Sequence, residues 1–299
     1  MRTISKPRGN AKDRVFIYRA IWITFSGNLI LAGLKFYLSR LSPSSALYSD
    51  ALNSISDVIY SLMIILGLIL AIRPPDIDHP QGHTRFEPLL AIVISLSMGW
   101  AGIGAFLNAI EKIRDGVEPF AIALPIAALA FSAAIKGVMY LLIKRIADQV
   151  QSATLKASAA DNLADTVTSF TAAVGIVLSR VGFPMADPIA AILVALWIFR
   201  AVIGLLNENL GFLTGAGIEE EERAAIYDAA RSVPGVLDVH QIIGEHVGSR
   251  HVIDIHINAD GEMKLCDVHE MISEVERRVY ALSKDIERVY IHVEPPGYD

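Results

Sequence analysis

The chain has 299 residues, of which 53% are hydrophobic and 19% charged, and its formal net charge is −6. Soluble domains usually carry about 25% charged residues, so the composition indicates a membrane protein with a soluble part, and the acidic balance argues against a nucleic-acid partner. The single cysteine, Cys266, excludes an internal disulfide framework and a cysteine-rich zinc site.

Six stretches in the first two thirds of the chain are long enough to cross a membrane, which takes about 20 mainly apolar residues. The predicted spans cover residues 16–39, 46–72, 88–110, 119–146, 153–179 and 185–206. Residues 1–15 are predicted to form a cytoplasmic N-terminal segment. The first stretch follows basic residues, but it is long and lacks a cleavage pattern, which favours a span over a signal peptide.

The distribution of basic residues predicts the orientation. An even number of spans places both termini on one side of the membrane. The N-terminal segment is basic, and the connections on the same side add Arg73, Arg85, Lys144, Arg145 and Lys156. By the positive-inside rule, both termini are predicted to be cytoplasmic. The membrane itself is expected to be the plasma or inner membrane of the cell.

Two predicted spans contain pairs of oxygen-bearing side chains. The second span has Asn53 and Asp57, and the fifth has Asp161 and Asp165. An aspartate at the centre of a membrane helix costs roughly 2.5–3.5 kcal/mol on insertion scales. Residues four apart lie on one face of a helix, so two facing pairs would place four oxygen ligands around one point. The pattern predicts a cation site in the membrane.

Oxygen ligands suit hard divalent ions such as Mn²⁺, Mg²⁺ or Fe²⁺. Asp161 and Asp165 repel each other on one helix unless they are protonated or bound to a cation. Entry of a metal ion would therefore expel protons, which gives a physical basis for antiport. The alternative is that these polar residues cap helices or pair with Lys35 or Lys136, in the first and fourth spans.

After the sixth span, the pattern predicts a second domain over residues 207–299. A helix is expected at 219–232, strands at 235–243 and 251–258, a helix at 268–282 and a strand at 287–293. The order αββαβ indicates a small α+β domain. Alternation along the strands predicts that Ile253, Ile255 and Ile257 face the core and that His256 faces away from it.

All eight histidines lie outside the predicted spans. Asp76, His79 and His83 share one loop, which could bind a divalent ion or could be solvated and rich in turns. Four residues share the strand face away from the core and predict a metal site at an interface, although ordinary exposed histidines are the alternative: His240, His256, His292 and Glu294. For His246 and His251 we favour no metal role, and His269 is a borderline case.

Together, these segments resemble the cation diffusion facilitator family over nearly the whole chain. The resemblance rests on the six spans, residues 49–57, 79–87 and 157–165, and the αββαβ tail ending His292-Val-Glu-Pro-Pro. It implies a ferredoxin-like tail and a homodimeric exporter that exchanges cytoplasmic divalent metal for external protons. The implied transport site is Asn53, Asp57, Asp161 and Asp165; the implied loop site is Asp76, His79 and His83; the implied tail site is His240, His256, His269 and His292, with Glu294 where an aspartate often occurs.

Zinc exporters of this family typically place a histidine at one or both first positions of the two pairs, whereas this chain has Asn53 and Asp161 there. The pattern is similar to the manganese or iron branch. We therefore predict a six-span α-helical membrane protein with a cytoplasmic α+β domain that exports divalent metal, Mn²⁺ first, with Fe²⁺, Zn²⁺ or Co²⁺ as alternatives. No enzymatic activity and no tightly bound cofactor are expected, apart from a regulatory metal in the tail.

Three functions of other classes remain as rivals. A magnesium or cation channel needs a continuous pore, and proton dependence with slow, saturable turnover would argue against it. A membrane-tethered metal sensor would tolerate loss of Asp161 but not of the tail histidines. An intramembrane metallohydrolase is disfavoured because no histidine lies near the membrane carboxylates. The chain has no phosphate-binding Gly-Lys-Ser/Thr loop, so ATP-driven transport is not expected.

Overall fold

The computed structural model describes residues 11–41, 45–71, 73, 75–115, 123–183 and 185–297. The chain forms two compact units. The membrane unit contains residues 9–74 and 86–209, and the C-terminal unit contains residues 75–85 together with 210–299. The connection between the second and third predicted spans thus belongs to the same compact unit as the tail.

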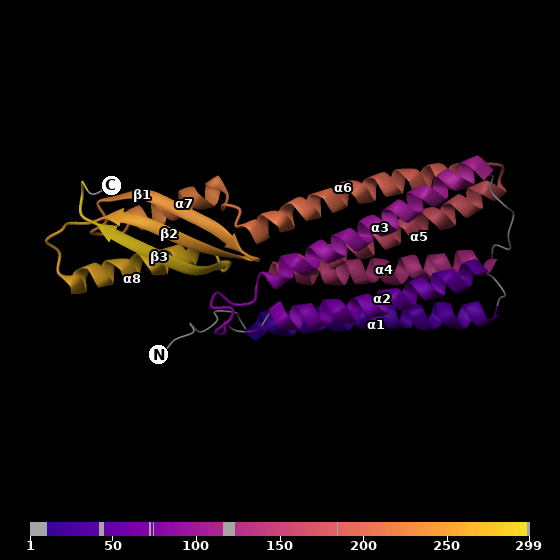
Figure 1. Ribbon diagram of the computed structural model, residues 1–299, viewed down its shortest axis with the longest axis horizontal. Coiled ribbons are helices and arrows are strands. Elements are labelled where there is room, and N and C mark those ends of the chain that lie inside the picture. The colour runs from indigo at the N-terminus through magenta and orange to yellow at the C-terminus, as the bar shows by residue number, and fades with distance from the viewer. Residues whose placement is uncertain are drawn as a thin grey trace. The chain divides into compact units, whose positions relative to one another are not determined.

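Six long helices coincide with the six predicted spans and run lengthwise beside one another (Figure 1). Their bounds are α1 Ala11–Leu41, α2 Ser45–Ala71, α3 Phe86–Asp115, α4 Ala123–Val150, α5 Ala153–Arg180 and α6 Ala186–Thr214. Helix α4 packs against α5 and α1, α1 also packs against α2, and α3 packs against α5. Met98 of α3, Ala164 of α5 and Val202 of α6 share one apolar cluster.

Four helical segments among the described residues are long and apolar enough to cross a membrane, namely 15–38, 86–115, 126–150 and 188–214. In α2, the apolar stretch found among the described residues is Asp57–Ala71. Helix α5 does not meet the same measure because aspartate, asparagine, serine and threonine interrupt it. Both helices that carry the predicted ligands thus have polar residues within the span.

The start of α5 is fixed by side-chain hydrogen bonds. Ser152 caps the helix, and its hydroxyl accepts a hydrogen bond from the Leu155 backbone N–H at 3.4 Å. The Thr154 hydroxyl donates to the Glu87 carbonyl at the start of α3, at 2.9 Å. Ser152, Thr154 and Leu155 are all buried. These contacts set the position of α5 beside α3, and with it the height of Asp161 and Asp165 about two and three turns further along.

The C-terminal unit has the predicted order αββαβ. Its elements are α7 Glu220–Arg231, β1 Asp238–Val247, β2 Arg250–Asn258, α8 Leu265–Leu282 and β3 Ile286–Glu294. The sheet order is β1-β2-β3, with β1 antiparallel and β3 parallel to β2. Strand β1 starts three residues later and ends four later than expected, because Gly235 turns the chain with φ +98° and the hairpin turn falls at Gly248.

One face of the sheet is covered by both helices. Ile253, Ile255 and Ile257 are fully buried there, against Ile226 of α7 and Val275 of α8. This agrees with the alternation expected from the sequence. The polar residues of the strands consequently lie on the other face.

A β-bulge in β1 interrupts the alternation at His240. Val239 pairs with Ile257, and Gln241 pairs with His256, so His240 has no partner of its own in the register. The core-facing position moves from Val239 to Ile242, which pairs with Ile255. Bulges often re-aim a side chain next to a functional site, and here the bulge leaves two successive polar residues away from the core.

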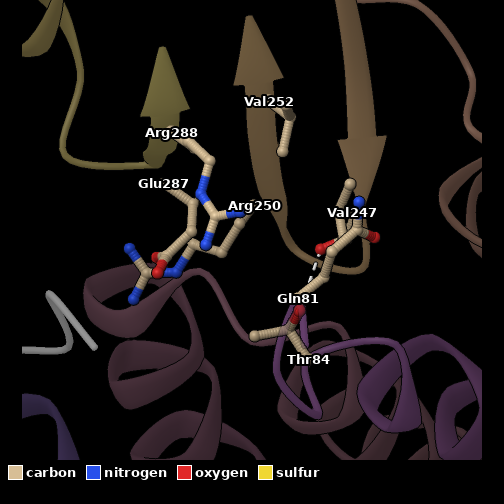
Figure 2. Close-up of a pocket in the computed structure, with 7 residues that line it drawn as sticks. All are labelled: Gln81, Thr84, Val247, Arg250, Val252, Glu287 and Arg288. Atoms are coloured by element: carbon tan, nitrogen blue, oxygen red, sulfur yellow. Dashed lines mark hydrogen bonds between the residues drawn. The ribbon is translucent and has the colours of Figure 1, made fainter. Parts of the chain in front are cut away.

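Residues 75–85 pack against the β1–β2 hairpin within the C-terminal unit. The Thr84 hydroxyl donates to the Val247 carbonyl at 2.9 Å (Figure 2). Gly248 has φ +68°, and a Cβ there would lie 2.5 Å from the Thr84 carbonyl, so only glycine allows this close approach. A small pocket beside the contact is lined by Gln81, Thr84, Val247, Arg250, Val252, Glu287 and Arg288.

Candidate metal-binding sites

Two of the predicted membrane ligands converge on one lysine. The Lys136 Nζ of α4 lies 2.8 Å from Asp165 Oδ2 of α5 and 3.5 Å from Asp57 Oδ2 of α2. The lysine side chain is only 6% exposed, whereas those of Asp57 and Asp165 are 33% and 40% exposed. The packing of α2, α4 and α5 thus forms a centre in which two carboxylates bind one cation, in this case an ammonium.

Asp161 lies one helical turn before Asp165 and is half-buried. Its negative charge also acts on the Lys136 ammonium. Asn53 lies in α2, but its side chain is outside the described residues. Two of the four predicted membrane ligands therefore contact Lys136. The pairing with this lysine, an alternative weighed from the sequence, is present in the structure.

A buried polar contact joins α1 to α2 next to this centre. Asn28 of α1 donates through Nδ2 to the Ser61 hydroxyl at 2.7 Å, and the Ser61 hydroxyl donates to the Asp57 carbonyl at 2.8 Å. Both side chains are buried. Sequence reasoning missed this pair. A polar residue in each of two neighbouring apolar spans is the signal that could have indicated it, since such residues hydrogen-bond across helices.

The three predicted loop ligands lie together. Asp76 approaches His79 Nδ1 and His83 Nε2, each at 3.4 Å, and the two rings are 4.5 Å apart between centroids. One imidazole or carboxylate atom from each residue lies within 4.8 Å of the others. His83 is buried, while Asp76 and His79 are exposed. An ion could therefore enter from the solvent on the side of Asp76 and His79.

The backbone helps to order this loop for cation binding. The His79 backbone N–H donates to Asp76 Oδ1 at 2.7 Å. This hydrogen bond, with smaller contributions from the His83 and His79 rings, holds the pKa of Asp76 below its ordinary value. The carboxylate therefore stays ionised at neutral pH, as a metal ligand requires.

The four predicted tail ligands form one row across the sheet. His256 and His292 are neighbours in the β2–β3 register, with ring centroids 4.9 Å apart. Glu294 contacts His240 Nε2 at 3.4 Å and His292 Nε2 at 2.9 Å. Suitable ligand atoms of His240, His256 and Glu294 lie within 4.8 Å of one another. The donor set of imidazoles and one carboxylate fits a transition-metal ion such as Zn²⁺ or Mn²⁺.

Asn258 supports this row, and the sequence analysis did not select it. Its Oδ1 lies 3.1 Å from His240 Nδ1. A hydrogen bond to one ring nitrogen fixes the tautomer and leaves the other nitrogen for metal. His269, by contrast, lies at the start of α8 and is in neither group of three candidate ligands found among the described residues. The structure thus brings together four of the five tail residues implied by the resemblance.

A second histidine pair lies at the hairpin end of the unit. His246 and His251 face each other across the β1–β2 register with ring centroids 4.4 Å apart, and His246 also stacks on Phe212. His251 Nδ1 lies 3.0 Å from Glu222 of α7. Burial, with a smaller effect of His251, lowers the pKa of His246. This pair is therefore explained by packing and by its carboxylate partner.

Comparison with known proteins identifies the class. Residues 21–214 match the cation efflux transmembrane domain, and residues 218–296 match the cytoplasmic domain of cation efflux proteins. The chain therefore belongs to the cation efflux family, the cation diffusion facilitators. This confirms the resemblance and the predicted class, a helical membrane domain followed by a cytoplasmic α+β domain. The family consists of transporters rather than enzymes, and the chain is a divalent-cation efflux transporter.

Individual relatives match over most of their length. The chain is 31% identical over 282 residues to the uncharacterized transporter MJ0449 of Methanocaldococcus jannaschii, covering 93% of this chain and 98% of that protein. It is 27% identical over 273 residues to the manganese efflux system protein MneS of Bacillus subtilis, covering 91% and 93%. A solved structure named MamM-CTD 215-293 is 29% identical and covers 25% of this chain and 96% of that chain, with a TM-score of 0.25.

Proposed function

We propose that this transporter exports Mn²⁺ from the cytoplasm in exchange for protons, using Asn53, Asp57, Asp161 and Asp165 as its transport site. The observation that carries the proposal is the convergence of Asp57 and Asp165 on one buried cation at 2.8–3.5 Å. Two carboxylates from different helices that contact one ammonium support this proposal, because a divalent ion could bind the same pair of oxygens. Alternating access would expose this centre to either side of the membrane.

Manganese is the proposed substrate on two grounds. The ligands named from the sequence offer only oxygen, which suits Mn²⁺ better than Zn²⁺. MneS, which matches nearly the whole chain, is a manganese efflux protein by name. Fe²⁺ has similar ligand preferences and is the first alternative, followed by Zn²⁺ and Co²⁺.

Cytoplasmic termini and a homodimer complete the proposal. With the termini inside, the C-terminal unit would sample cytoplasmic metal through its two clusters, Asp76–His79–His83 and His240–His256–His292–Glu294. Metal there would favour one arrangement of the dimer by its differential affinity for that arrangement. The tail metal would thus tune the rate of transport without forming part of the pathway.

Transport in proteoliposomes tests the function directly. The purified full-length chain should move Mn²⁺ in a saturable manner, with protons moving in the opposite direction, and should move Zn²⁺ and Mg²⁺ more slowly. Dissipating the proton gradient should slow Mn²⁺ uptake. Rapid, unsaturable and proton-independent flux would indicate a channel, and an absence of flux with all five ions, Mn²⁺, Fe²⁺, Zn²⁺, Co²⁺ and Mg²⁺, would indicate a sensor.

The tail row, which consists of His240, His256, His292 and Glu294, predicts a regulatory effect that can be separated from transport itself. Changing His256→Ala together with His292→Ala removes two adjacent imidazoles from the face opposite the apolar core, so the fold should be retained. Calorimetry on the full-length chain carrying Asp165→Ala, which silences the proposed transport site, should show weaker Zn²⁺ and Mn²⁺ binding in the double variant. With Asp165 intact, the double variant should still transport, but with a smaller response to cytoplasmic metal.

His251→Ala provides the matched control for the tail row. It removes a histidine from the same strand, but one that is held by Glu222, and metal binding should be unchanged. Unchanged binding in the double variant as well would show that the histidines of the row are merely solvated.

A further inference from the structure

Lys136 occupies the position in which a transported ion is expected. Its ammonium contacts one oxygen of Asp165 and one of Asp57, at 2.8 and 3.5 Å. A metal ion bound by both carboxylates would need the same region of space, so the two cations exclude each other. The lysine side chain is buried, and its stem comes from α4, which contributes none of the four proposed ligands.

The charges around Lys136 explain why a buried lysine is tolerated there. Asp165 and Asp57 contact the ammonium directly, and Asp161 lies one helical turn before Asp165. A buried charge is costly unless it is paired, and neighbouring carboxylates repel one another unless a cation or a proton lies between them. Lys35 of α1 is a second buried cation, but Lys136 is the lysine that lies 3.5 Å from Asp57. Lys136 is therefore the counter-charge that the structure places against Asp57 and Asp165.

We propose that Lys136 is a tethered counter-cation that holds Asp57 and Asp165 together in the metal-free transporter and is displaced by the arriving divalent ion. This inference rests on the proposed transport site. A lysine ammonium sits on a flexible four-carbon stem, so it can leave the carboxylates without movement of α4. It acts as a positioning residue and not as a metal ligand.

A tethered counter-cation lowers the affinity of the membrane centre for the metal ion and speeds release of that ion. The incoming ion must break the ammonium–carboxylate contacts before it gains its own, which weakens net binding. When the ion leaves, the ammonium returns and competes with rebinding. A transport site needs binding that is strong enough for entry and weak enough for exit, and a tethered competitor supplies the second condition.

Neutral replacement of the lysine tests the proposal. In Lys136→Met, Mn²⁺ should bind the full-length protein at least about tenfold more tightly, because hydrogen bonds to charged groups contribute free energy of that order. Transport should show a lower KM together with a lower kcat. Lys136→Arg keeps the charge and should retain the weak binding of the parent. Lys144→Met, at an exposed position on the same helix, should leave the Mn²⁺ affinity, KM and kcat unchanged.

The binding that belongs to this centre is defined as the Mn²⁺ binding that Asp165→Ala removes. If the parent shows no such binding, the proposed transport site is wrong and this inference falls with it. If the parent binds but both Lys136→Met and the polar, neutral Lys136→Gln bind no more tightly, only the role of Lys136 is overturned. Use of both neutral variants guards against a fold defect in one, and rescue by Lys136→Arg separates a requirement for charge from one for side-chain volume.

Discussion

Asp165→Ala should abolish Mn²⁺ transport while leaving the protein folded and inserted. Asp165 makes the shortest contact in the membrane centre, 2.8 Å to the Lys136 ammonium, and its carboxylate would be an ionic ligand of the transported ion. Loss of a mere supporting partner of a metal ligand typically costs 10–100-fold, so loss of the ligand itself should reduce transport by more than about 100-fold. The measurement is the initial rate of Mn²⁺ uptake into proteoliposomes.

The same assay compares the other carboxylates. Asp57→Ala and Asp161→Ala should be equally inactive, while Asn53→Ala should be milder because an amide adds no charge. Glu208→Ala is the matched control, since Glu208 is a helix carboxylate that instead approaches Lys156 at 3.9 Å, and it should transport normally. Full Mn²⁺ transport by Asp165→Ala would refute the assignment of the site.

Much of the fold could be predicted because its signals are local. Long apolar runs separated by charged or proline-rich breaks indicated all six long helices, and a period of two indicated which face of β2 holds Ile253, Ile255 and Ile257. The tail row followed from the same alternation, since residues two apart on neighbouring strands share a face. The bulge at His240 was not predicted. Its signal in the sequence is the pair of successive polar residues, His240 and Gln241, between Val239 and Ile242.

The features that could not be predicted depend on packing between distant segments. The sequence shows lysines in the first and fourth spans, but only the arrangement of α2, α4 and α5 decides that Lys136 contacts both Asp57 and Asp165. The contact of Thr84 with Val247 joins residues 163 positions apart, and no local pattern marks it. Its one local sign is Gly248, whose missing side chain allows the loop backbone to approach.

Adding an imidazole to the membrane centre should shift the preference among metals. In Asp161→His, one oxygen ligand becomes a nitrogen ligand, which Zn²⁺ accepts readily and which suits Mn²⁺ less well. The ratio of Zn²⁺ to Mn²⁺ transport should rise by about tenfold or more, since a difference of about 1.4 kcal/mol in binding is sufficient for that change. Asn53→His should act in the same direction. Parallel uptake assays with the two ions measure the ratio.

The pH profile gives an independent check on the same variants. Imidazole titrates near pH 6.5 in the absence of other effects, and a protonated imidazole cannot bind metal. Transport by Asp161→His should therefore decline on acidification of the metal-loading side in a way that Asp161→Asn, which introduces no imidazole, does not share. If Asp161→His and Asn53→His both keep the metal ranking of the parent, ligand hardness does not determine selectivity, and the preference for Mn²⁺ must arise from the size or hydration of the site instead.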